Sequence, residues 1–250
     1  MSVNKPYYLT VRQFKDGSYA NSGRSLYISH PSYGEKPSNY IRAFELIEKD
    51  LLTLFEYIEP AAVNRKAYSF RTFELFLRTC TEIEANFKSI LRSNTYSRSS
   101  ARNLNIEDYF KINSSHFLSK YEVHLPHWDG TGSVRRPFKL WNSVTHRLDW
   151  YQSYNDAKHD RAQNLGSASL ENLVDAVCGL AVVIAAQFYT YTFTGPDYII
   201  ASGPDGDEIL GNYFRIIFPK NIPNAKRYDF DWQTLQNTPN PLQKFDYDKV

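Results

Sequence analysis

The sequence AVCGLAVVIAA, from Ala176 to Ala186, is the most apolar segment of this 250-residue chain. Asp175 precedes it and Gln187 follows it, so the uninterrupted apolar run is only 11 residues long. A helix that crosses a membrane needs about 20 apolar residues, whereas a helix that is apolar on every side is typical of the centre of a bundle. The segment therefore predicts a buried central helix in a mainly α-helical fold, and no membrane span.

Two amphipathic stretches upstream provide surfaces for such a helix. Apolar residues recur with helical spacing from Ile41 to Ile58 and again from Phe73 to Leu91. Ser38 or Asn39 can cap the first helix, and the second helix is expected to start near Ser69. We therefore expect two long antiparallel helices.

Further helices are expected after a polar loop. Asn105 can cap a short helix, and a longer one is expected over residues 143–166, because the glycine at its end is a common C-terminal stop. Ser167 or Ser169 can then cap the apolar helix. Together these segments predict a bundle of four or five helices.

Strand-like sequences lie before and between the helices. The run YYLTVRQF at residues 7–14 and the segment 25–29 predict a loose N-terminal hairpin. The stretch 123–141 is rich in glycine and proline and can hold another hairpin, with the strand-like FKLW at its end.

The C-terminal part has the same character. Two β-like runs, residues 197–210 and 212–220, accompany the turn signal at 203–206 and predict a terminal hairpin. The last thirty residues are polar with scattered aromatics, as in a strap over the surface or a frayed tail. The expected parts of one compact domain are a β-like extension (1–37), a helical bundle (38–193), and a β hairpin with a polar tail (194–250).

Composition limits the class of function. Hydrophobic residues make up 42% and charged residues 22% of the chain, which excludes disordered, collagen-like and fibrous proteins. The 29 Lys and Arg against 27 Asp and Glu leave a net charge of +2, so no global field drives the chain onto nucleic acid or acidic lipid. Residues 88–139 are locally basic, which fits either a basic surface or solvated loops.

The two cysteines indicate a compartment. Cys80 and Cys178 both fall within apolar helical patterns, where a free thiol behaves as a small hydrophobe. The N-terminal sequence has no apolar stretch of signal-peptide length. We therefore expect a protein of the reducing cytoplasm.

The helix expected over residues 143–166 carries the densest cluster of reactive side chains. One helical stripe holds Trp150, Tyr154, Lys158 and Arg161, and the adjacent stripe holds Tyr151, Asn155 and His159. Arginine and lysine bind phosphate, aromatic rings stack on unpaired bases, and an imidazole can take the proton from a ribose 2′-hydroxyl without a metal. The face therefore suits RNA. Alternatively, Asp156 and Asp160 pair with the cations and leave an ordinary solvent-exposed helix.

The sequence YNDAKHDR, residues 154–161, together with the order of the helices, resembles the HEPN superfamily of bacterial and archaeal defence and toxin proteins. The family's mark is an Arg followed after four to six residues by a His, with a polar residue often directly after the Arg. Asn155 matches that polar residue and His159 matches the His, whereas Tyr154 stands at the Arg position. The resemblance covers roughly residues 38–192.

This resemblance implies a homodimer in which the motifs of two protomers meet across a cleft and cut RNA without a metal or another cofactor. Such an endoribonuclease would belong to a defence or toxin–antitoxin system. His159 would act as acid or base, and Asn155 would position the substrate. Lys158 or Arg161 would replace the cation that is missing at Tyr154, although Arg161 follows the histidine instead of preceding it.

The tyrosine at position 154 equally fits a catalytically inactive HEPN-like module that binds RNA or a partner protein, such as an antitoxin. In that case Tyr151 and Tyr154 would contact RNA beside Lys158. Arg135 and Arg136, in the loop GTGSVRRP, are further candidate phosphate contacts, although the loop lacks the GK[ST] ending of a P-loop.

Two other groups of titratable side chains have weaker patterns. The motif VHLPHWD, residues 123–129, invites a metal interpretation, but its proline breaks any helix that would align the ligands, and we expect no metal. Glu82 and Glu84 either face water or fix the tautomer of His159.

Overall fold

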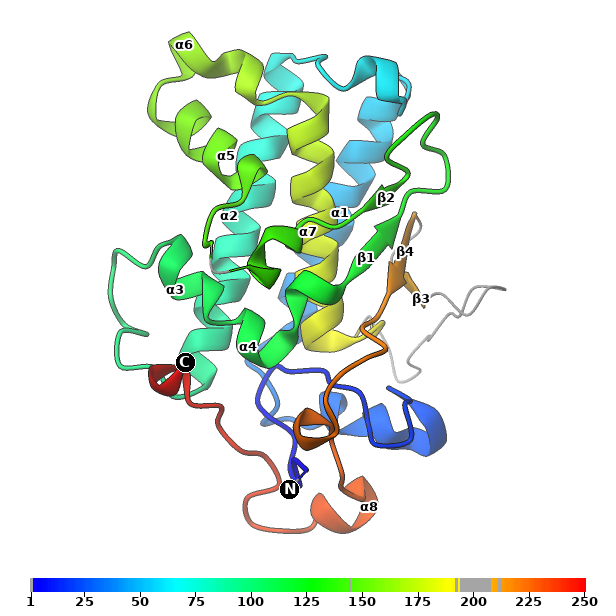
Figure 1. Ribbon diagram of the computed structural model, residues 1–250, viewed down its shortest axis with the longest axis vertical. Helices are drawn as coiled ribbons and strands as arrows, with labels where there is room; N and C mark the ends of the chain where they lie inside the picture. Colours follow the sequence, from blue (N-terminus) through cyan, green and yellow to red (C-terminus); the bar gives the residue numbers. More distant parts are fainter. Residues whose placement is uncertain (1, 144, 192, 194–207, 211–212) are drawn as a thin grey trace.

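The computed structural model describes residues 2–143, 145–191, 193, 208–210 and 213–250, and over these residues the fold is mainly helical (Figure 1). The long helices are α1 (Pro37–Phe55), α2 (Phe70–Ser93), α5 (Asp149–His159) and α7 (Leu170–Phe188). The short helices are α3 (Ile106–Phe110), α4 (Asn113–His116), α6 (Arg161–Asn164) and α8 (Trp232–Leu235). The expectation of a mainly α-helical fold with β additions is thus confirmed at this level.

The central helix is α7. Ser169 caps it by accepting a hydrogen bond from the Asn172 backbone N–H, and every residue from Ala176 to Phe188 is buried. It packs against α1, α2 and α5. By length and composition α7 is apolar enough to cross a membrane, yet 83% of its most apolar window is buried within the fold. It is the core helix that the segment AVCGLAVVIAA predicts.

The starts of α1 and α2 show how local sequence determines helix ends. Ser69 and Thr72 form a capping box, in which the Ser69 Oγ accepts from the Thr72 N–H (3.1 Å) and the Thr72 Oγ1 accepts from the Ser69 N–H (2.6 Å). α1 begins earlier than expected, at Pro37, because proline's fixed φ suits the first helical position. Ser38 and Asn39 therefore lie inside α1 and do not cap it.

The helix expected over residues 143–166 is shorter and broken. α5 starts at Asp149, and the backbone leaves helical geometry at Asp160 (φ −141°, ψ 76°) before α6 and a 3₁₀ turn at Leu165–Ser167. The Asp160 carboxylate accepts a hydrogen bond from the Gln163 N–H (3.2 Å) and so caps α6. Aspartate in this role competes with the continuing helix for backbone donors, which explains the break.

A four-stranded antiparallel sheet lies beside the helices, with strand order β2-β1-β4-β3. The strands are β1 (Glu122–His124), β2 (Val134–Arg135), β3 (Glu208–Leu210) and β4 (Phe214–Ile217). Val123 pairs with Arg135 on one side and with Ile216 on the other. The hairpin expected within 123–141 is therefore present.

The structure differs from the expected β structure at residues 138–141, and it describes only part of the expected C-terminal hairpin. FKLW at 138–141 overlaps a 3₁₀ helix, Lys139–Asn142, and is not a strand. β3 and β4 form a C-terminal hairpin. The rest of the first predicted run, residues 197–207 with its turn signal, lies outside the described residues.

The N-terminal hairpin prediction is wrong. Residues 21–29 form a 3₁₀ helix, and Val3 and Phe14 make isolated parallel bridges to Tyr228. The aromatic residues that suggested a strand pack on distant rings, as Phe14 does on Phe230 with centroids 5.0 Å apart. The blue N-terminal and orange C-terminal segments therefore lie side by side in Figure 1.

Arg12 joins this N-terminal segment to two others. Its buried guanidinium donates to the backbone oxygens of Ser115 (2.8 Å) and Lys226 (3.2 Å). The same group lies 5.6 Å from the ring centroid of Phe245. The polar C-terminal segment is thus a strap, with Tyr247 fully buried. Both terminal regions contribute to the same core as the helices.

Candidate functional site

The aromatic side chains of α5 face the interior. Trp150, Tyr151, Tyr154 and Ala157 are buried, and the Trp150 Nε1–H donates to the Pro137 backbone oxygen (2.9 Å). Tyr154 meets Phe76 of α2 in an edge-to-face contact with centroids 6.4 Å apart. Tyr151 and Tyr154 are therefore core residues, and the prediction that they stack on RNA bases is wrong. Helical periodicity shows which residues share a face but does not show which face is covered.

Tyr151 also binds the Glu84 carboxylate. The Tyr151 hydroxyl donates to the Glu84 carboxylate (2.9 Å), which also accepts from the Lys88 ammonium (3.4 Å). Burial, and then the negative charge of Glu84, raise the pKa of Tyr151, so its hydroxyl stays protonated. Glu84 is thus engaged two helical turns away from His159 and does not set the tautomer of that imidazole.

The polar end of α5 remains open to solvent. Lys158, His159 and Arg161 are exposed, and Asn155 is half-buried one turn before His159. The predicted residues that the structure brings together at this end are therefore Asn155, Lys158, His159 and Arg161. We call them the α5-end cluster.

Lys158 has an unusual partner within this cluster. Its ammonium donates to the Tyr154 hydroxyl (3.3 Å) and lies 5.1 Å from the centroid of the Tyr154 ring. The hydrogen bond from Lys158 to Tyr154 raises the pKa of the ammonium, which therefore stays charged at neutral pH. A fixed cation thus lies beside the side chain at position 154.

The alternative of an ion-paired helix face does not match the contacts. Asp156 accepts a hydrogen bond from Gln152 (2.9 Å), and Asp160 caps α6. Among the described residues, no carboxylate forms an ion pair with Lys158 or Arg161. Both cations are therefore available to a ligand.

Arg135 is removed from the candidate phosphate contacts. It is buried, with its guanidinium donating to the carboxylates of Glu171 (2.7 Å) and Asp175 (3.0 Å). It also stacks on the Trp128 ring at 4.5 Å. Burial raises the pKa of Asp175 to about 6 in spite of this cation. The arginine that the loop sequence suggested as a surface contact is the centre of an internal ion-pair cluster.

Arg136 is exposed but already paired with Glu122 of β1 (2.6 Å). Two other basic residues of the locally basic stretch are paired as well, Lys88 with Glu84 and Arg98 with Asp108. A continuous basic surface over residues 88–139 therefore has less free charge than its sequence suggests.

The histidine motif at 123–129 shows no metal geometry. His127 lies against the Tyr213 ring with centroids 5.8 Å apart, and the Asp129 backbone N–H donates to the Pro60 oxygen (2.8 Å). Over the part of the chain that the structure describes, no three His, Cys, Asp or Glu side chains are placed to hold a metal ion.

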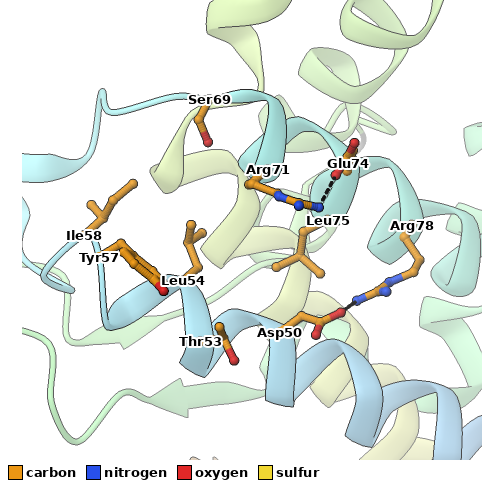
Figure 2. Close-up of a pocket in the computed structure, with 10 residues that line it drawn as sticks. All are labelled: Asp50, Thr53, Leu54, Tyr57, Ile58, Ser69, Arg71, Glu74, Leu75 and Arg78. Carbon is orange, nitrogen blue, oxygen red and sulfur yellow. Dashed lines mark hydrogen bonds and ion pairs between the residues drawn. The ribbon is translucent and has the colours of Figure 1, made fainter.

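A pocket of about 770 Å³ lies between α1 and α2 (Figure 2). Apolar residues Leu54, Ile58 and Leu75 line it, and two ion pairs, Arg71 with Glu74 and Arg78 with Asp50, lie at its edge. None of the candidate site residues predicted from the sequence is among its described lining residues.

Exposed aromatic rings near the start of α2 were not anticipated from the sequence. Tyr68 is 56% exposed and Phe70 is 59% exposed. The helical pattern from Phe73 onward does not include these two residues, and a sequence pattern cannot show which side chains at the start of a helix stay exposed. The sequence signal that could have indicated their exposure is their position on either side of Ser69, at the start of the helix.

Comparison with protein-family models, with curated proteins and with solved structures finds no match for this chain. The assignment of a function therefore depends on the geometry of the residues themselves.

Proposed function

We propose that this chain is a HEPN-like, RNA-directed protein of a prokaryotic defence or toxin–antitoxin system, and that it cuts RNA without a metal at the α5-end cluster. The observation that supports this is the exposure of His159, Lys158 and Arg161 beside the half-buried Asn155, within two turns of backbone, with no carboxylate among the described residues paired to either cation. The aromatic side chains of α5 are buried in the core. Only the polar end of this helix is therefore accessible to a substrate.

The proposed reaction follows from the chemistry of these side chains. The His159 imidazole accepts the proton of a ribose 2′-hydroxyl, and the freed oxygen attacks the adjacent phosphorus. A bond from O2′ to phosphorus forms as the bond to O5′ breaks, and O5′ takes a proton from a protonated imidazole or from water. Lys158 and Arg161 stabilise the negative charge that grows on the non-bridging oxygens. Asn155 holds the substrate through its amide.

Lys158 also accounts for the tyrosine in the motif. Its ammonium folds back over Tyr154, so that a cation lies beside position 154, where the family carries its arginine. This supports Lys158 as the replacement for that charge. In keeping with the family, we propose a cytoplasmic homodimer.

The test is incubation of the purified protein with total RNA and structured RNA in EDTA, read on a gel. We expect cleavage by the native protein and a loss of about 10²–10⁴-fold in the His159→Ala variant, because general acid–base catalysis contributes that much. Gln152→Ala, on the exposed face of the same helix, should cleave normally. Absence of cleavage by the native protein, or equal cleavage by His159→Ala, would reject the proposed nuclease.

A second candidate function has its own supporting observation. The Lys158 ammonium already donates one hydrogen bond to the Tyr154 hydroxyl, whereas Arg161 has no polar partner among the described residues. A module with this arrangement binds RNA or a partner protein without cutting it. Retained RNA binding without cleavage, in a protein that light scattering shows to be dimeric, would favour this module.

A further inference from the structure

The contacts between α5 and α2 determine which surface adjoins His159. Tyr151 bonds Glu84, Tyr154 contacts Phe76, and the Arg161 guanidinium lies 5.7 Å from the Phe70 ring centroid. Residue numbers rise along α5 as they fall along α2, so the two helices are antiparallel. The end of α5 and the start of α6 therefore lie beside the start of α2 (Figure 1).

Two exposed rings flank α6 at this end. Phe70 lies beneath Arg161, and the ring of Tyr68 lies beside Gly166, where an added Cβ would be 3.9 Å from Tyr68 Cε1. More than half of each of these two residues is exposed. Exposed aromatic rings beside a candidate active site are typical of ligand-binding surfaces.

The charges around these rings favour a phosphate-bearing ligand. Lys158 and Arg161 are exposed, as is Lys66 two residues before Tyr68, and within the described residues none of them forms an ion pair with a carboxylate. The α1–α2 pocket on the other side of α2 differs, since each of its arginines is paired. Free cations beside exposed aromatic rings are the combination that binds single-stranded nucleic acid.

We propose that Tyr68 and Phe70 form a stacking platform for unpaired bases of an RNA strand whose phosphates contact Lys66, Lys158 and Arg161. The inference rests on the proposed function and deepens it, because it restricts the α5-end cluster to single-stranded RNA. In the free protein Arg161 covers Phe70, and this exposed contact is weak enough to be exchanged for a base. A duplex cannot use the platform, since its bases are stacked on one another.

The test measures binding separately from cleavage. A short fluorescein-labelled single strand of 2′-O-methyl RNA, which has no free 2′-hydroxyl to react, is titrated with the native protein and with variants, and anisotropy is read. Phe70→Ala and Tyr68→Ala should each weaken binding by about 5- to 100-fold, the range for losing one base–aromatic stack. Phe70→Tyr should bind like the native protein. A duplex of the same sequence should bind more weakly and be insensitive to these changes.

Tyr57→Ala is the matched control, because Tyr57 is 82% exposed but lines the α1–α2 pocket. We expect unchanged binding, and circular dichroism should show that every variant is folded. Equal losses for Tyr57→Ala, or native affinity in both Phe70→Ala and Tyr68→Ala, would overturn the platform. So would a loss of self-association in these variants with RNA binding intact, which would assign the rings to a second copy of the chain.

The two proposals fail in distinguishable ways. Cleavage that depends on His159 but not on Phe70 or Tyr68 would remove the platform and leave the nuclease standing. Binding that depends on the rings, without any cleavage of ordinary RNA, would keep the platform and replace the nuclease by the binding module. No binding of single-stranded RNA by the native protein would reject the platform, whereas cleavage of structured RNA that depends on His159 would still support the nuclease.

Discussion

Asp175 illustrates, at the scale of one residue, how burial links ionisation to stability. It shares the Arg135 guanidinium with Glu171, and burial raises the pKa of Asp175 from 3.8 to about 6. A carboxyl whose pKa is higher in the folded than in the unfolded chain stabilises the fold while it is protonated. Its contribution is therefore complete below pH 3.8 and is lost as the pH rises through 6.

The variant Asp175→Asn should remove this dependence, because the amide has nearly the same shape and does not ionise. Between about pH 4 and pH 7 we expect the native protein to lose on the order of 1–3 kcal/mol of unfolding free energy relative to the variant. Urea denaturation of both proteins across this range measures the difference. Asp156→Asn, an exposed change, is the control, and parallel pH curves for native protein and Asp175→Asn would contradict the expectation.

The candidate site shows what can be read from a sequence at the residue scale. Of the motif residues, Lys158 and His159 are exposed and Asn155 is half-buried, while their roles at a site stay predictions. It could not show that Tyr151 and Tyr154 point inward, because both faces of α5 carry side chains that suit either core or ligand. Arg135 was misassigned for a similar reason, since its carboxylate partners come from α7, which lies 36 and 40 residues away in sequence.

Gly179 shows, at the scale of an element, how closely α7 is packed. It lies in the middle of the helix, where an added Cβ would be 3.5 Å from Trp150 Cζ2. The same atom would be 3.6 Å from both Ile83 Cδ1 and Phe138 Cζ. These are ordinary van der Waals contacts, so one methyl group fits and a larger side chain does not.

Gly179→Ala should therefore stabilise the protein by about 0.5–1 kcal/mol, because alanine loses less backbone entropy than glycine in a helix. Gly179→Leu should destabilise it by about 1–3 kcal/mol or more through overpacking. Thermal unfolding of the three proteins measures the order, and a destabilised alanine variant would show that α5 is closer to α7 than described.

Element boundaries were predictable where the signal is local. The start of α2 near Ser69 was correctly predicted, and of the two caps predicted for α7 the structure shows Ser169, because a serine that bonds a backbone N–H three residues later acts within one turn. The N-terminal hairpin failed because the partners of Phe14 and Tyr7 come from residues 228–245. Aromatic rings that pack on distant residues need no regular spacing in the sequence. Their pattern therefore does not distinguish a strand from an irregular segment.

The C-terminal strap packs against both the N-terminal segment and the helices. Tyr247 is fully buried, and its hydroxyl is 2.6 Å from the Ser115 Oγ. Asp246 forms a backbone bridge with Thr95, directly after α2. The strap thus connects the start of the chain, the end of α2 and the α4 region in one core.

Tyr247→Ala should lower the stability of the entire protein by about 3–5 kcal/mol, the range for removing a large buried side chain. We expect one cooperative transition at lower denaturant concentration, followed by tryptophan fluorescence and by circular dichroism. The exposed change Lys249→Ala should have little effect. Separate transitions for the strap and for the helices would show that the terminal regions are an independent layer.

The position of α7 in the sequence has a consequence for folding during synthesis on the ribosome. The apolar faces of α1 and α2 are synthesised early. The helix that covers them, α7, is complete only when Phe188 has emerged. At about 5–20 residues per second, the ~95 residues between the ends of α2 and α7 take on the order of 5–20 s to synthesise. During that interval the apolar faces of α1 and α2 are exposed to solvent, and a chaperone would then have the largest apolar surface to bind.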